Sequence, residues 1–425
     1  YQDINPGQYR LLRLLSGEKG NLCAVGDADQ AIYGFRGADL TNFLSFTTDF
    51  PGARTIQLGE NYRSTATIVR ASDSMIRSNR ERVDKELVPT GAEGARITVI
   101  SVPDERAEGE AIVRETEQRI GGTSHFVIDS GECSHASGSY AFSDFAVIYR
   151  THSQARAIEE AFSQSGIPCR VLGGRGMAGQ DAVADTLSVM RSIIHPGDDL
   201  SLRRTAQIMG LPEQSLSKTA KLAEAQGLTL REAMESLVGE EASIAGFIAR
   251  RSKISDLVQG ETAAEIIAVI GHDLGKGESQ GISALLNLAV SYGNDISRFI
   301  AEAELLSPAD DYNPRVDAVT LMTLHAAKGL EFRTVFITGC EDGLIPYTLG
   351  KECNEEEERR LFYVGMTRAK EELCLIHSRS RLIHGQRLTP QPSPFLKDIP
   401  GEFLNRTSIP DRIKKEKKET QMGLF

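Results

Sequence analysis

The sequence predicts an α/β fold in which a parallel β-sheet is covered by helices. Short apolar runs bounded by polar turns are typical of buried strands, and they recur at 21–26, 97–101, 145–149, 319–324, 335–338 and 373–377. Helical patterns lie between several of these runs, at 105–120 and 154–165. Strands that alternate with helices favour a parallel sheet, whose ligands bind at the carboxyl ends of the strands.

Residues 176–308 follow a different pattern. Apolar residues recur there at helical spacing, for example at Leu187, Met190 and Ile194, and Gly and Pro separate the periodic stretches. Runs of β-branched residues are nearly absent. This pattern predicts a mostly helical subdomain inserted between two parts of the α/β domain.

Composition limits the class of protein. A length of 425 residues favours two or three domains, and 40% hydrophobic with 25% charged residues is typical of a globular chain. No apolar run reaches the roughly 18 residues of a membrane span, and no signal peptide is recognisable, so we expect a cytoplasmic protein. Six cysteines without a CxxC pair indicate reduced thiols rather than disulfides or a zinc ribbon.

Charge and two irregular segments add further limits. A net charge of −11 means that any nucleic-acid contact must use a local groove. The Gly- and Ser-rich segment 121–140 holds His125, Cys133 and His135, but a fourth metal ligand at fixed spacing is missing. We therefore expect a surface loop there and predict no metal site. The charge-dense segment 406–420 is expected to be a flexible linker.

The first motif, at 26–39, reads GDADQAIYGFRGAD. A strand here delivers carboxylates and an amide to a turn, and two aromatic residues and an arginine follow. This suits a phosphate-sensing Gln30 linked to a platform of Tyr33 and Phe35 that stacks on single-stranded bases. The alternative, a turn with aromatic core residues, stays open on this motif alone.

The second motif, at 60–65, reads ENYRST. Tyr62 beside Arg63 allows one side chain to stack on a purine while the other reaches a phosphate. A helix cap at Ser64 or Thr65, with Arg63 in a surface ion pair, is the simpler explanation of this motif taken alone.

The third motif, at 320–332, reads TLMTLHAAKGLEF and is expected to be a strand that ends in a polar loop. Gly329 lets a ligand approach the backbone, while His325, Lys328 and Glu331 offer hydrogen bonds to sugar or phosphate. The alternative is a buried strand with a solvated turn.

The fourth motif, at 357–370, reads EERRLFYVGMTRAK. At helical spacing Arg360, Tyr363 and Thr367 share a face, and Arg368 falls close to the same edge. An arginine held there can neutralise charge that develops on a transferred phosphoryl group. The alternative is a charged surface helix with many ion pairs.

Together, in this order and wording, the four motifs strongly resemble helicase motifs III to VI of the UvrD/Rep family of superfamily 1A DNA helicases. The resemblance is close over 1–100, 143–175 and 316–400, loose over 176–315, and weak elsewhere. It implies a RecA-like sheet of the P-loop NTPase type. The implied domains are a remnant of domain 1A (1–57), domain 2A in two parts (58–175 and 316–400), the helical insert 2B (176–315) and a flexible tail (401–425).

The resemblance also implies roles for single residues. Gln30 resembles the sensor of the ATP γ-phosphate, with Asp27 beside it, and Arg63 and Arg368 resemble the two arginine fingers. Tyr62 is similar to the tyrosine that stacks on adenine, and Glu331 to the glutamate that holds the ribose. Lys328 and Gly329 complete the ATP-binding set. The implied DNA contacts are Tyr33, Phe35, Arg36, Thr323 and His325, with Phe35 standing where many members have tryptophan.

The last five residues, QMGLF, resemble the short peptide with which bacterial proteins dock on the DNA sliding clamp. The expected contacts are Gln421, Leu424 and Phe425. Chance occurrence of so short a motif is the alternative, but the position at the end of a charged linker favours docking.

The implied activity is that of an ATP-dependent 3′→5′ DNA helicase and translocase in DNA repair or replication restart, with ATP and Mg²⁺ as cofactors. The sequence holds no GxxxxGK[ST] phosphate loop, and the Asp-Glu pair that would precede Tyr1-Gln2-Asp3 in motif II is absent. We therefore expect the chain to be the C-terminal part of a longer enzyme and to be inactive alone. The alternative is a helicase-like scaffold that binds DNA or the clamp without turnover.

Overall fold

The computed structural model describes residues 1–17, 21–121, 140–172, 181–277, 279–305, 316–349, 353–383 and 385–410. The chain forms two compact units, one of Tyr1–Val171 with Pro314–Phe425 and one of Leu172–Asn313. The second unit occupies the stretch where the sequence predicts an insert over 176–315.

A seven-stranded sheet is the centre of the first unit, with the order β11-β3-β8-β7-β4-β6-β5 and every neighbouring pair parallel. Its strands are β3 (Ile97–Val102), β4 (Phe145–Tyr149), β5 (Cys169–Val171), β6 (Val319–Thr323), β7 (Phe332–Ile337), β8 (Ala369–Ser378) and β11 (Leu404–Ser408). The interior strand β4, between β7 and β6, is buried along its whole length, which explains why it reads as a continuous apolar run.

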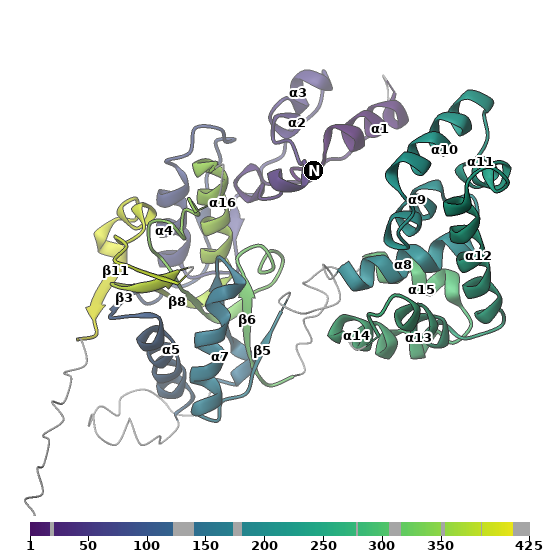
Figure 1. The fold of residues 1–425 in the computed structure, drawn as a ribbon. Coiled ribbons are helices and arrows are strands. Elements are labelled where there is room, and N and C mark those ends of the chain that lie inside the picture. The colour runs from purple at the N-terminus through teal and green to yellow at the C-terminus, as the bar shows by residue number, and fades with distance from the viewer. Residues whose placement is uncertain are drawn as a thin grey trace, which may run out of the picture. The chain divides into compact units, whose positions relative to one another are not determined.

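Helices cover both faces of this sheet (Figure 1). On one face α5 (Glu105–Ile120) and α7 (Ala155–Gln164) pack on each other and on the sheet, and they enclose a core of residues such as Ile112, Phe162 and Phe336. On the other face lie α4 (Ala66–Ile76) and α16 (Glu355–Met366). A Cβ on Gly365 would lie 3.1 Å from Ile337 Cδ1 and would clash with Leu324, so glycine lets α16 approach the sheet.

The remaining elements of this unit are short. They are α1 (Pro6–Ser16), α2 (Thr41–Leu44), α3 (Phe46–Asp49), β1 (Glu60–Asn61) with β2 (Val88–Pro89), the hairpin β9 (Arg381–Ile383) and β10 (Gln386–Leu388), and 3₁₀ turns η1 (Ala28–Gln30), η2 (Gly34–Arg36), η3 (Phe142–Asp144), η4 (His152–Gln154), η6 (Pro394–Lys397) and η7 (Gly401–Phe403). Three leucines of α1, Leu11, Leu14 and Leu15, are exposed.

The second unit is helical in its described residues. It contains α8 (Asp181–Ile194), α9 (Asp199–Ile208), α10 (Glu213–Gln226), α11 (Leu230–Leu237), α12 (Ala242–Leu257), α13 (Ala263–Asp273), α14 (Gln280–Ala289), α15 (Ile296–Leu305) and the turn η5 (Val290–Tyr292). Capping boxes at Thr229 and Thr262 fix the starts of α11 and α13. One core includes Met190, Ile267 and Phe299, and a second includes Leu216 and Phe247.

Two sequence predictions about this fold are wrong. The apolar run 21–26 does not form a strand, because no strand among the described residues forms backbone hydrogen bonds with it. Val25 within this run is exposed. The sequence predicts that the flexible linker begins at 406 and the flexible tail at 401. Both starting points are wrong, because Leu404–Ser408 form the edge strand β11 beside β3. Among the described residues, no helix combines the length and the apolar character needed to cross a membrane.

Candidate functional site

Gln30 lies in the turn η1, whose geometry Asp27 fixes. The Asp27 carboxylate caps the turn by accepting the backbone N–H of Asp29 at 3.1 Å, and its other oxygen accepts the Gln30 side-chain amide at 2.8 Å. The predicted pair Asp27 and Gln30 is therefore brought together. The amide of Gln30 has one defined orientation, set by this carboxylate.

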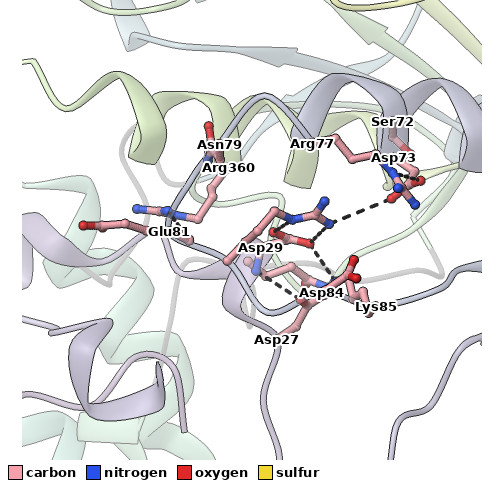
Figure 2. A network of polar contacts seen from close by, with 12 residues as sticks. Asp27, Asp29, Ser72, Asp73, Arg77, Asn79, Glu81, Asp84, Lys85 and Arg360 are labelled. Carbon is pink, nitrogen blue, oxygen red and sulfur yellow. Dashed lines mark hydrogen bonds and ion pairs between the residues drawn. The ribbon is translucent and has the colours of Figure 1, made fainter. Parts of the chain in front are cut away.

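Two cations hold the carboxylates of this turn (Figure 2). Arg82 donates to both oxygens of Asp29, at 3.2 and 2.9 Å, and Lys85 pairs with Asp29 at 3.1 Å and with Asp27. The sequence reasoning missed Arg82 and Lys85. Basic residues recur through 77–85 without an apolar periodicity to explain them, but their spacing does not indicate which carboxylates they bind.

Arg368 is almost completely buried, with 1% of its surface exposed. Its guanidinium donates to Val364 O at 2.9 Å, Leu330 O at 3.2 Å and Thr367 Oγ1 at 3.0 Å, all neutral acceptors. Burial, with a smaller contribution from the charge of Arg63, lowers the pKa of Arg368 to about 10. The cation is thus placed without a carboxylate partner among the described residues, and an anionic ligand would complete its coordination.

The helix prediction for this motif needs correction. Helix α16 ends at Met366, so Arg368 lies in the turn before β8 and not on the face shared by Arg360 and Tyr363. The alternative of a charged surface helix is also wrong, because residues 359–366 are buried.

Arg63 and Glu331 form an ion pair with 2.8 Å between Nε and Oε2, and Lys370 binds the other carboxylate oxygen at 2.7 Å. The hydrogen bond from Lys370, followed by that from Arg63, lowers the pKa of Glu331. Tyr62, next to Arg63, leaves 75% of its surface exposed, so its ring is accessible to a planar ligand. Arg63, Glu331 and Arg368 are close enough for their charges to interact.

The loop between β6 and β7 spans the sheet. Thr323 is level with Tyr149 at the carboxyl end of β4, whereas Thr334, after Glu331, is level with Phe145 at its amino end. Glu331, directly before β7, therefore lies at the opposite edge of the sheet from Thr323. Gly329 turns the chain with a φ of 90°, which favours glycine.

Lys328 lies between the Gln30 turn and the aromatic residues. Its ammonium group binds Asp3 Oδ2 at 2.5 Å and the backbone carbonyl of Gln30 at 2.9 Å. It also lies 4.8 Å from the centre of the Tyr33 ring. Its contacts are thus with Asp3, with the Gln30 turn and with Tyr33.

The structure brings the aromatic residues of the predicted platform, Tyr33 and Phe35, into contact with each other. Phe35 lies 6.1 Å from Tyr33 and 5.1 Å from His325 between ring centres, and the Arg36 guanidinium lies 5.4 Å from both Tyr33 and Phe35. Phe35 is 64% exposed, which excludes the alternative of a core aromatic for this residue. Thr323 accepts the Ala326 N–H at 3.2 Å, which shapes the turn that carries His325.

His325 is held as a neutral imidazole. Burial, and then the charges of Arg150 and Arg36, lower its pKa to about 4. A neutral ring can donate one hydrogen bond and accept another.

Glutamates at the start of α16 fasten the surrounding segments. Glu356 accepts the backbone N–H groups of Arg80 and Glu81, each at 3.1 Å, and Glu358 binds Arg150 with 2.7 Å between Oε1 and the guanidinium. One turn further, Arg360 donates to Ala31 O at 3.1 Å, directly after Gln30. The helix therefore holds the Gln30 turn through its buried arginine.

Some predicted residues lie outside the described part of the chain. They are His125, Cys133 and His135 of the Gly- and Ser-rich loop and Gln421, Leu424 and Phe425 of the terminal peptide.

The seven-stranded parallel sheet, with the Gln30 turn, the buried Arg368 and the aromatic cluster, defines an α/β protein of the helicase-core class. The profile of the UvrD-like helicase C-terminal domain matches residues 56–243 and 278–380, and that of the UvrD/REP helicase N-terminal domain matches residues 1–51. The chain belongs to the UvrD/Rep helicase family.

Curated relatives agree with this assignment. The ATP-dependent DNA helicase PcrA of Bacillus subtilis is 33% identical over 99% of this chain and 59% of its own length. The PcrA proteins of Staphylococcus aureus and Staphylococcus epidermidis are each 33% identical, over 96% and 95% of this chain and 58% of their own lengths. The chain thus spans less than two thirds of these relatives. A solved C-terminal domain of a possible DNA helicase from Lactobacillus plantarum aligns with 81% of this chain and 98% of its own at 11% identity and a TM-score of 0.31, a similarity too low to support a conclusion.

Proposed function

We propose that this chain is the C-terminal part of an ATP-dependent 3′→5′ DNA helicase and translocase that acts in DNA repair or replication restart. The relatives named ATP-dependent DNA helicase support this proposal. The observation that carries it is that one residue, Lys328, contacts both the Gln30 turn and the Tyr33 ring. A phosphate sensor and a base-stacking platform in direct contact are what a motor that steps along DNA needs.

The donors of the site fit a nucleoside triphosphate. Arg63 and Arg368 supply fixed cationic forks for phosphate, Gln30 supplies an oriented amide, and Glu331 can accept a ribose hydroxyl. The exposed Tyr62 ring offers a stacking surface for adenine. We assign Lys328 and Gly329 to the same proposed nucleotide site, and the arginines would stabilise charge on the transferred phosphoryl group.

The described residues do not form a metal site by themselves. No group of three His, Cys, Asp or Glu among them is close enough to hold a metal ion. Asp27 and Asp29 are already paired with Lys85 and Arg82. We propose that the ligands of Mg²⁺ belong mostly to other residues of the complete enzyme.

Single-stranded DNA is the proposed ligand of the aromatic cluster. The exposed Phe35 ring, with Tyr33 beneath the Arg36 guanidinium, offers stacking surfaces for bases and a cation for the backbone. His325 packs against Phe35 at the end of β6, and Thr323 shapes the turn that carries His325, so we assign both residues to the same proposed DNA contact.

ATP hydrolysis tests this proposal. The complete gene product that contains residues 1–425 should hydrolyse ATP faster when single-stranded DNA is added, whereas the 425-residue chain alone should show negligible turnover. Absence of DNA-stimulated turnover in the complete gene product would contradict the motor function and favour the scaffold that binds without hydrolysis.

We also propose that the terminal peptide docks on the bacterial sliding clamp through Gln421, Leu424 and Phe425. A synthetic peptide of the last ten residues should bind the purified clamp, and replacing Leu424 and Phe425 by alanine should abolish binding. A wild-type peptide that does not bind would eliminate this partner.

A further inference from the structure

The segment 79–85, which follows α4, is fastened to helix α16. The side-chain amide of Asn79 donates to Glu356 O at 2.8 Å, and the Glu356 carboxylate accepts the two following backbone N–H groups. Arg360 donates to Glu81 O at 3.5 Å from the same helix. The segment therefore has a fixed position relative to the helix that precedes Arg368.

From this segment two cations reach the Gln30 turn (Figure 2). Arg82 forms an ion pair with Asp29, whose side chain is 2% exposed, and Lys85 pairs with both Asp29 and Asp27. A carboxylate as buried as Asp29 is costly without a hydrogen-bonded partner, so the pairing with Arg82 fixes the turn. Lys85 is 18% exposed and lies 5.7 Å from the Tyr363 ring centre, which limits its alternative positions.

Lys85 acts on Gln30 through a single intermediate. One oxygen of Asp27 accepts Lys85 and the Asp29 N–H, and the other accepts the Gln30 amide at 2.8 Å. The position of the first oxygen therefore fixes the second, and with it the amide. Without the ammonium group, the first oxygen of Asp27 keeps only the capping hydrogen bond from Asp29, so the carboxylate that orients the Gln30 amide is held less firmly.

We propose that Lys85 is a positioning residue for Gln30, acting through Asp27, and that Arg82 anchors the same turn through Asp29. Lys85 needs no contact with nucleotide for this role. The kinetic consequence rests on the proposed function, because Gln30 affects turnover only where the complete protein hydrolyses ATP. The structural consequence, a fixed Gln30 amide, does not depend on hydrolysis.

The kinetic test uses the complete gene product with Lys85→Met, Lys85→Arg and the matched control Arg77→Met. Arg77 forms an ion pair with Asp73 at 2.7 Å in the same region and does not touch Asp27 or Asp29. Because a misplaced catalytic group costs up to about 100-fold in rate, Lys85→Met should lower kcat by about 10-fold or more while KM for ATP stays within about threefold. Lys85→Arg should restore most of kcat, and Arg77→Met should match the wild type.

A normal kcat in Lys85→Met, or an equal loss in Arg77→Met, would overturn the proposal. A rise in KM alone would also overturn it, because that result indicates direct binding of nucleotide rather than positioning.

A second measurement is independent of ATPase activity. In the 425-residue chain with ¹⁵N-labelled glutamine, the Gln30 side-chain amide resonance is identified by its loss in Gln30→Ala. Lys85→Met should make this amide more mobile on the nanosecond timescale and faster in hydrogen exchange, whereas Arg77→Met should leave it unchanged. An equally rigid amide in a folded Lys85→Met chain would refute the positioning role. If the wild-type complete protein lacks ATPase activity, the proposed function fails and this measurement still decides the inference.

Discussion

The carboxylate of Glu357 accepts a hydrogen bond from the backbone N–H of Gly34 at 2.9 Å, across 323 residues of sequence. This bond joins the first turn of α16 to the turn η2, which carries Phe35 and Arg36. A Cβ on Gly34 would lie 2.5 Å from Glu357 Oε2, so a larger residue there would displace the Glu357 carboxylate. The helix that precedes Arg368 therefore also holds the aromatic platform.

Replacing Glu357 by alanine should weaken single-stranded DNA binding about three- to tenfold, because loss of one hydrogen bond of about 1 kcal/mol lets the η2 turn move. Glu357→Gln keeps an acceptor oxygen and should bind nearly as the wild type does. Fluorescence anisotropy with a labelled oligothymidine measures the effect. Glu355→Ala is the control, because Glu355 lies two residues earlier in α16 and pairs with Arg359. Equal DNA affinities for Glu357→Ala and the wild type would show that the aromatic platform does not depend on its hydrogen bond to α16.

Phe35 should supply the main stacking surface for a base. One stacked base contributes about 1–3 kcal/mol, so Phe35→Ala should weaken the affinity for oligothymidine between about 5-fold and 150-fold. Phe35→Trp, with a larger ring, should bind at least as well as the wild type. Phe50→Ala, which removes a ring that packs against Phe46 instead, serves as the control. Tight binding by Phe35→Ala would place the DNA elsewhere.

His325 predicts a defined loss of stability in acid. Its pKa is about 4 in the folded chain, because of burial and the nearby arginines, against about 6.5 when unfolded. Between these two values the unfolded chain binds more protons, so the stabilisation that is complete above pH 6.5 is lost progressively as the pH falls towards 4. An NMR titration, with the resonance identified by His325→Asn, should show a neutral imidazole down to about pH 4. Protonation near pH 6.5 would contradict this account.

A buried ionic cluster should govern the stability of the sheet. Arg381 binds Glu341 at 2.7 Å and Glu108 at 2.8 Å, and both carboxylates are 1% exposed. Arg381→Met leaves two buried carboxylates without their cation and should destabilise this unit by about 3–5 kcal/mol. Hydrogen exchange of β7 and β8 as a function of urea measures the change. Arg387→Met, which removes an arginine that is 55% exposed, should have little effect. A comparable loss of unfolding free energy in Arg381→Met and Arg387→Met would contradict the special role of the buried cluster.

Much of the sheet is predictable because its strands are buried on both faces. The runs at 97–101, 145–149, 319–324, 335–338 and 373–377 each lie in or overlap one of the strands β3, β4, β6, β7 and β8. The edge strands β5 and β11 escape prediction, since β5 has three residues and β11 buries only Leu404. A pattern of apolar residues cannot reveal a strand that is held mainly by backbone hydrogen bonds.

The site divides in the same way. Residues such as Gln30, Phe35 and Arg368 are recognisable because each lies in a short motif that groups phosphate-binding or base-stacking residue types within a few positions. Arg82 and Lys85 lie more than 50 residues from the carboxylates that they bind. Their role depends on the packing of the 79–85 segment on α16, which no local spacing encodes. The same holds for Glu331, whose place at the amino end of β7 follows from the course of a loop.

Strand displacement by the complete gene product tests the central claim most directly. The substrate is a duplex with a single-stranded tail at either the 3′ or the 5′ end, incubated with ATP and Mg²⁺. The account predicts ATP-dependent displacement from the 3′-tailed duplex, and a rate about 1,000-fold or more lower for Arg368→Ala, which lacks the cation that stabilises the transferred phosphoryl group. Displacement confined to the 5′-tailed duplex, or full activity in Arg368→Ala, would contradict it.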